Sequence, residues 1–227
     1  QHNHSVFGYT FGNEKIGDST FAKDVCSKLQ QVRSALQGFG GKSIIVAPDT
    51  GIQRSQGYSP ADMDKDPSIQ QHLQYLKTFL DTCGSYIDAV SWHTYDFRAW
   101  DIDTSLPSHH AVLPYPPPLA STNLSRAWSQ TYWHGAVKLL RNVSALVAAH
   151  APHLPEAWLT ETNSFNHGGI ANLSNTFFNS LFLVNRLGIM SKGSVQVMGR
   201  QTLIGYNYSL LGDFPNEPVM PAPDYFT

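Results

Sequence analysis

Residues 43–93 decide the fold of this chain, because they contain one complete strand–helix–strand unit. Ser43–Ala47 reads Ser-Ile-Ile-Val-Ala, an apolar run typical of a buried strand, and Pro48-Asp49-Thr50-Gly51 ends it. Ile69–Leu80 carries apolar residues at helical spacing on one face. Tyr86–His93 reads Tyr-Ile-Asp-Ala-Val-Ser-Trp-His and predicts the next strand. A helix between two such strands favours a parallel pair with a right-handed crossover.

The same alternation extends in both directions along the chain. Further strands are predicted over Ser5–Phe11, Ala157–Thr160 and Ser194–Met198, and further helices over Phe21–Leu36, Trp128–His150 and Phe177–Leu187. This pattern is typical of a parallel α/β sheet, either a (β/α)8 TIM barrel or a doubly wound open sheet. No Gly-rich phosphate loop follows the first strand, which disfavours the nucleotide-binding version of the open sheet.

A closed eight-stranded barrel needs three more strand–helix units, roughly 100 residues at ~30 residues per unit. We therefore expect the chain to be the second, larger part of a barrel. Residues 1–212 are the expected catalytic domain, and residues 213–227 the expected tail that leads out of it. Asp96–Ser125 is rich in Pro, Ser and His, and is expected to form a loop over the cleft.

Composition excludes several classes of protein. Of the 227 residues, 41% are hydrophobic and 14% charged, which argues against disorder. A net charge of −2 argues against a nucleic-acid partner. No apolar run approaches the roughly 18 residues of a transmembrane segment. The aromatic content of 12% would suit a carbohydrate cleft, because aromatic rings stack on sugars, although most rings are expected in the core.

The cysteines and the glycosylation motifs bear on the compartment. Cys26 and Cys83 allow one disulfide, and the sequence leaves open whether they form it or remain free thiols. Asn-X-Ser motifs favour an extracellular, lysosomal or otherwise lumenal protein, and occur at Asn123, Asn142, Asn172 and Asn207.

No motif predicts a metal or another cofactor. His109-His110 and His2/His4 lack acidic or Cys partners at ligand spacing, and no His-Glu-x-x-His occurs. A serine hydrolase is disfavoured because there is no Gly-x-Ser-x-Gly motif.

Two glutamates stand at corresponding places in the pattern. Glu14 follows the first predicted strand in Phe11-Gly12-Asn13-Glu14, and Glu161 follows a later one in Trp158-Leu159-Thr160-Glu161. Because parallel strands end at the same edge of a sheet, the two carboxylates are expected to face each other at the mouth of a barrel. One carboxyl that protonates a leaving oxygen and another that attacks or activates water are the minimum equipment for glycoside hydrolysis.

A series of motifs in order resembles glycoside hydrolase family 79, the heparanase-like and β-glucuronidase proteins. The series covers the chain from about Tyr9 to Tyr208, and its members are Gly12-Asn13-Glu14, Ala47-Pro48-Asp49-Thr50-Gly51, Ile87–Tyr95, Trp158–Thr162 and Val197–Gln201. The resemblance implies a (β/α)8 barrel of which this chain holds about strands four to eight. It also implies that the first three strands form an upstream segment of the same precursor, and that the family's β-sandwich domain is absent from this chain.

The resemblance also implies roles for the two glutamates and their neighbours. Glu14 corresponds to the acid/base and Glu161 to the nucleophile, and Asn13 would bond the sugar 2-hydroxyl. The sequence departs from the family in Lys15, where a proline is usual, and a cation there would favour the ionised form of Glu14.

Further residues are implied to bind substrate. His93 and Tyr95 would line the sugar site, with Tyr95 orienting Glu161; a buried, structural histidine is the open alternative for His93. Arg54 would contact the carboxylate of a uronic acid. The backbone of Gly168 and the hydroxyl of Tyr208 would lie near the same carboxylate, although Gly168 could simply form a turn. Arg200 could contact the same sugar carboxylate, but we favour a structural role in which it pairs with a barrel carboxylate and holds the surroundings of Glu161.

The sequence thus predicts a cofactor-free retaining glycosidase that acts on β-glucuronides or uronic-acid-containing glycans. Two alternatives stay open. One is a related retaining glycosidase with a neutral sugar substrate, and the other is a secreted homologue that binds glycans without cleaving them.

Overall fold

The computed structural model describes residues 7–15, 19–38, 43–55, 57–98, 130–154, 156–170, 173–193, 195–212 and 218–226. Residues 99–129, which hold most of the predicted cleft loop and Asn123, lie outside the described residues. So do Asn172 and the histidines at positions 2, 4, 109 and 110.

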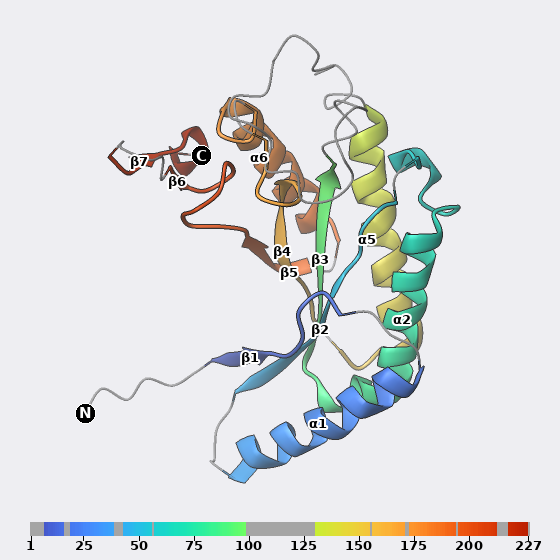
Figure 1. Ribbon diagram of the computed structural model, residues 1–227. Coiled ribbons are helices and arrows are strands. Elements are labelled where there is room, and N and C mark those ends of the chain that lie inside the picture. The colour runs from blue at the N-terminus through green and yellow to red at the C-terminus, as the bar shows by residue number, and fades with distance from the viewer. Residues whose placement is uncertain are drawn as a thin grey trace, which may run out of the picture.

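The centre of the structure is one parallel sheet of five strands (Figure 1). The strands lie in chain order and are β1 (Gly8–Thr10), β2 (Ile44–Gly51), β3 (Ala89–Phe97), β4 (Glu156–Phe165) and β5 (Val195–Arg200). Every neighbouring pair is parallel. Among the described residues, β1 and β5 each have a strand neighbour on one side only.

Helices connect the strands, as the alternation of the sequence predicts. They are α1 (Ser19–Gly38), α2 (Pro67–Cys83), α5 (Gln130–His150) and α6 (Phe177–Ser191). In Figure 1, α1, α2 and α5 lie along one side of the sheet. The start of α2 shows why a helix begins there: the Asp66 carboxylate accepts from the N–H groups of Ser68 and Ile69, and Pro67 occupies the first turn. The predicted parallel α/β sheet of a partial (β/α)8 barrel is confirmed.

The main core fills the space between the helices and the sheet. Its largest fully buried members include Trp92, Phe79, Leu29 and Leu159, from β3, α2, α1 and β4. Each buries apolar surface worth on the order of 2 kcal/mol. No helix in the described part of the chain is long and apolar enough to span a bilayer.

Cys26 and Cys83 form a disulfide between α1 and α2, which settles the alternative that the sequence leaves open. Both residues are buried in the main core. The bond joins positions 57 residues apart and thereby ties the first two helices together.

The strands that carry the candidate site are longer than predicted. The expected end of β3 at His93, the expected loop start at Asp96 and the expected end of β4 at Thr160 are wrong, because β3 continues to Phe97 and β4 to Phe165. The reason is a second apolar cluster in which Phe97 and Phe165 pack on Phe178 and Phe182 of α6. The polar residues that suggested strand ends are instead strand residues of the site.

The chain after β5 forms a small structure of its own. β6 (Leu211–Gly212) pairs antiparallel with β7 (Met220–Pro221), and a short 3₁₀ helix covers Pro223–Phe226. The predicted domain boundary at residue 212 stays a prediction.

Candidate active site

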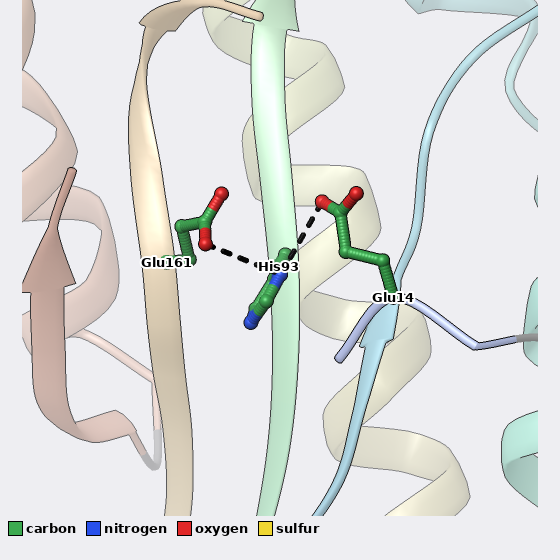
Figure 2. A group of neighbouring side chains, drawn as sticks. All are labelled: Glu14, His93 and Glu161. Atoms are coloured by element: carbon green, nitrogen blue, oxygen red, sulfur yellow. Dashed lines mark hydrogen bonds and ion pairs between the residues drawn. The ribbon is translucent and has the colours of Figure 1, made fainter. Parts of the chain in front are cut away.

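Glu14 follows β1, and it meets His93 and Glu161, which lie within β3 and β4 (Figure 2). His93 lies on β3 between the two glutamates, and Figure 2 shows its ring between their carboxylates. One ligand atom from each of the three side chains lies within 4.8 Å of the other two. Three segments that are distant in the sequence therefore place two carboxylates around one imidazole.

The turn after β1 fixes Glu14. The backbone N–H of Glu14 donates to the Asp49 carbonyl at 2.7 Å, and Glu14 has a φ of 51°. Gly12 has a φ of 124°, and a Cβ built there would lie 1.9 Å from the Pro48 carbonyl oxygen. Only glycine permits this close approach of the turn to β2.

Two polar side chains contact one oxygen of the Glu14 carboxylate. Its Oε1 lies 3.3 Å from His93 Nδ1 and accepts from Gln53 Nε2 at 3.1 Å. Gln53 in turn accepts from Arg98 at 2.6 Å through its own Oε1. The hydrogen bond from His93 lowers the pKa of Glu14, and burial opposes this shift. The positive charges of His93 and Arg98 and the hydrogen bond from Gln53 lower the pKa further. Lys15, whose positive charge is expected to favour the ionised form of Glu14, is exposed to solvent.

Glu161 has a firmer contact than Glu14. The Tyr95 hydroxyl donates to Glu161 Oε1 at 2.5 Å, and Oε2 lies 3.7 Å from His93 Nδ1. Its side chain is 25% exposed, against 39% for Glu14. Burial and the hydrogen bond to Glu161 both raise the pKa of Tyr95, so its hydroxyl stays protonated as a donor. Glu161 is therefore the more fixed of the two carboxylates.

His93 is a positively charged centre at neutral pH. Burial lowers its pKa, but hydrogen bonds to Asp49 and Glu14 outweigh burial and raise the pKa to about 9. Its Nε2 lies 3.0 Å from Asp49 Oδ2. Glu14, His93 and Glu161 could also reach one cation, but a metal would first have to displace the proton on Nδ1.

Two β-bulges flank His93. Asp49 is an extra residue of β2 relative to β3, because Pro48 pairs with Ser91 and Thr50 with Trp92. Thr160 is likewise extra on β4, since Leu159 pairs with Trp92 and Glu161 with His93. Bulges often lie next to active sites and redirect side chains there. Here the Thr160 hydroxyl donates to Asp49 Oδ1, so the two bulges contact each other across β3.

A cavity of about 390 Å³ opens above the glutamates. It is lined by Glu14, Gln53, Tyr95, Glu161, Asn166, His167, Gly168, Gln201, Tyr206 and Tyr208. Tyr208 stacks on Tyr95 with ring centroids 6.2 Å apart. Gly168 has a φ of 91°, and a Cβ there would meet the Tyr206 ring at 2.8 Å. The structure thus brings five of the predicted site residues (Glu14, Tyr95, Glu161, Gly168 and Tyr208) into one cavity, with His93 beneath them.

Other predicted residues lie elsewhere. Asn13 is exposed in the turn and does not line this cavity. Arg54 is 5% exposed and donates to the Tyr58 carbonyl, away from the cavity lining. Arg200 donates to the backbone carbonyls of Tyr208 at 2.6 Å and Thr202 at 3.4 Å, and the carboxylate partner expected for it stays a prediction. The substrate contacts predicted for Asn13 and Arg54 stay predictions.

The site residues that sequence reasoning missed are Asp49, Gln53, Asn166, His167, Gln201 and Tyr206. Asp49 and Gln201 stand inside motifs of the family resemblance, and Gln53 follows one of them by two positions. That closeness was the available signal. Tyr206 carries no comparable mark in the sequence.

Comparison with known proteins agrees with the geometry. No family model matches the chain. Heparanase-like protein 2 of Arabidopsis thaliana is 25% identical over 99% of this chain and 36% of its own length. Heparanase of Bos taurus is 31% identical over 68% of this chain and 24% of its own. The chain thus spans about a third or less of these curated relatives.

A solved structure shows the fold. The GH51 arabinofuranosidase of Xanthomonas axonopodis pv. citri matches with a TM-score of 0.63 at 11% identity, over 97% of this chain and 41% of its own. At that identity the likeness concerns the fold alone. The ordered motifs and the curated relatives agree, and the resemblance of the chain to the heparanase-like proteins of glycoside hydrolase family 79 is confirmed.

Proposed function

We propose that the protein is a retaining glycosidase that cleaves β-glucuronides or uronic-acid-containing glycans. The observation that carries this proposal is the pair of carboxylates at the carboxyl end of the sheet, with ligand atoms of Glu14 and Glu161 within 4.8 Å of each other. Carboxyl groups about 5–5.5 Å apart are typical of retaining enzymes, whereas inverting enzymes hold them ~6.5–9.5 Å apart to admit a water molecule.

The surroundings of the two carboxylates support different roles. Glu161, held by Tyr95, is the nucleophile that attacks the anomeric carbon and forms the glycosyl-enzyme. Glu14 is the more exposed group and delivers a proton to the leaving oxygen, then takes one from the attacking water. Because His93 lowers the pKa of Glu14, this acid role requires that the bound substrate displace water and favour the neutral carboxyl.

The uronic-acid substrate is supported by the wall beside Glu161. Gly168 and Tyr208, which correspond to carboxylate-binding positions in the family, adjoin each other there and line the cavity. Tyr208 packs on Tyr95, the residue that donates to Glu161, so the proposed uronate position lies next to the proposed nucleophile. Exposed aromatic surface from Tyr206 adds an apolar face of the kind that sugars stack on.

The test is hydrolysis of a chromogenic β-glucuronide by the full chain, beside Glu14→Gln, Glu161→Gln and the surface control Asp81→Asn. We expect both glutamine variants to lose activity by orders of magnitude, and Asp81→Asn to retain it. A substrate whose leaving group needs no protonation should restore the first step in Glu14→Gln but not in Glu161→Gln. Proton NMR of the first product should show retention of configuration. A folded parent that cleaves no glucuronide would leave the neutral-sugar or binding-only alternatives.

We also propose that three further strand–helix units, in an upstream segment, complete the barrel between β1 and β5, and that the protein acts outside the cell or in a lysosome. The single-sided strands β1 and β5 support the first point. The Cys26–Cys83 disulfide and the Asn-X-Ser motifs at Asn142 and Asn207 support the second. A loss of mass on enzymatic removal of N-glycans from the native protein is the corresponding check.

A further inference from the structure

Asp49, which the sequence did not predict as a site residue, contacts both Glu14 and His93. It lies at the β2 bulge with a φ of 56° and is 6% exposed. A non-glycine residue in this backbone conformation is uncommon, and such residues cluster at functional sites. Both of its carboxylate oxygens and both of its backbone polar groups have partners on other segments.

The carboxylate of Asp49 holds the His93 ring from below. Oδ2 lies 3.0 Å from Nε2, and Oδ1 accepts from the Thr160 hydroxyl. With both oxygens engaged, the carboxylate cannot turn without losing one contact. An acceptor fixed at Nε2 keeps a proton on that nitrogen, which leaves Nδ1 to face the glutamates.

The backbone of Asp49 holds the chain on either side of that ring. Its carbonyl accepts from the N–H of Glu14 at 2.7 Å, and its own N–H donates to Ser91 Oγ at 2.9 Å. Thr160, the partner of its carboxylate, directly precedes Glu161. One buried residue is therefore linked to the turn of Glu14, to the strand of His93 and to the strand of Glu161.

We propose that Asp49 is a positioning residue that aims His93 Nδ1 at both glutamates and ties together the three segments that carry them. Its effect on turnover rests on the proposed glycosidase function. Its effect on the His93 ring does not, and can be measured separately.

The charged groups around His93 determine how the loss of the Asp49 charge would change the pKa of His93. The ring faces Asp49 from β2, Glu14 from the turn after β1 and Glu161 from β4. Arg98 also acts on Glu14, through Gln53. Removing the Asp49 charge leaves the buried ring with the two glutamates as its anionic partners. The pKa of His93 should then fall, since burial disfavours its charged form.

The test is the change Asp49→Asn in the full chain, which preserves shape and removes the charge. Nitrogen–proton NMR of the histidine rings reports which ring nitrogens carry protons, and the His93 signal is assigned by its loss in His93→Gln. We expect the proton affinity of the ring to fall at least about tenfold. We expect kcat/KM on a β-glucuronide to fall about 10-fold to 100-fold, mostly in kcat, the size of effect seen for groups that orient a metal-binding histidine.

Asp88→Asn is the matched control. Asp88 directly precedes β3, at the end of that strand away from the site, where it accepts from Ile45 N–H at 2.7 Å and from Arg33 at 2.6 Å. It should lower the free energy of unfolding without moving the His93 titration or the pH–activity profile. Should Asp49→Asn not fold, Thr160→Val against Thr160→Ser tests the same carboxylate, and only the valine change should alter His93.

The outcomes separate the two proposals. An unchanged His93 titration in Asp49→Asn overturns the positioning role, whatever happens to activity. A shifted titration with a parent that cleaves no glucuronide supports the positioning role and contradicts the proposed reaction. A shifted titration with full turnover would show that the orientation of the His93 ring does not affect catalysis. That result would overturn the part of the inference that concerns turnover.

Discussion

At the scale of single residues, the site consists of charged side chains that neighbouring polar groups hold in place. Tyr95 fixes one carboxylate with one hydroxyl, and His93 lies between both carboxylates with its charge supported by Asp49. Charge-assisted hydrogen bonds of this kind are stronger than neutral ones and depend on a single donor atom. Removing one donor should therefore affect chemistry more than stability.

Tyr95→Phe should lower kcat about 10-fold to 100-fold while the thermal midpoint moves little. The change removes only the hydroxyl that donates to Glu161 Oε1, and an oriented hydrogen bond to a reacting group is worth about 2–3 kcal/mol. Tyr75→Phe is the control, because Tyr75 is a buried tyrosine of α2 outside the cavity. Equal activities of the two variants would contradict the role of Tyr95.

The charge on His93 should make stability fall as the solution becomes alkaline. The pKa of His93 is raised to about 9 in the folded protein, so its contribution is complete below its ordinary value near 6.5 and is lost as pH rises through about 9. The loss is expected to reach up to about 3 kcal/mol. Urea unfolding at pH 6, 7.5 and 9 measures it. His93→Gln should flatten this pH dependence, and an equal slope in the variant would argue against a charged ring.

At the scale of elements, the sequence predicts the sheet better than the site. Apolar runs and helical periodicity locate the strands and helices because burial demands them. Strand ends are harder, since polar residues such as Thr94, Thr162 and Asn163 look like a loop in the sequence although they are buried within strands. The bulges at Asp49 and Thr160 could not be predicted at all, because a bulge is a relation between two strands.

The close packing of β4 on β5 gives a prediction at this scale. A Cβ at Gly199 would lie 2.1 Å from the Thr160 carbonyl oxygen, a backbone atom that cannot yield without moving the bulge before Glu161. Gly199→Ala should lower the free energy of unfolding by about 2 kcal/mol or more and reduce activity strongly. Gly188→Ala in α6, where the new methyl group meets nothing within 4 Å, should instead stabilise by about 0.5–1 kcal/mol. Denaturant unfolding distinguishes the two.

At the scale of the whole molecule, the disulfide and the sheet act on different parts of the protein. Cys26 and Cys83 join helices on the outside of the sheet, whereas the site lies in the turn after β1 and within β3 and β4. The bond restricts the unfolded chain, and its effect on stability should be large and its effect on the site small.

Replacing both cysteines by serine should lower the free energy of unfolding by about 2–4 kcal/mol with little change in KM. A reducing agent should lower the thermal midpoint of the parent and leave that of the double variant unchanged. If reduction instead abolished activity at temperatures where the fold persists, the disulfide would act on the site, contrary to this expectation.

The order in which the site groups occur along the chain has a consequence for the protein during its synthesis. Glu14 is made first, Asp49 and His93 follow, and Glu161 and Tyr208 come late. No local segment holds both carboxylates, so the pair forms only when strands from distant parts of the chain have paired. On the proposed mechanism, a nascent or stalled chain would carry the acid without its nucleophile, and would not cleave glycans in the compartment in which it is being folded.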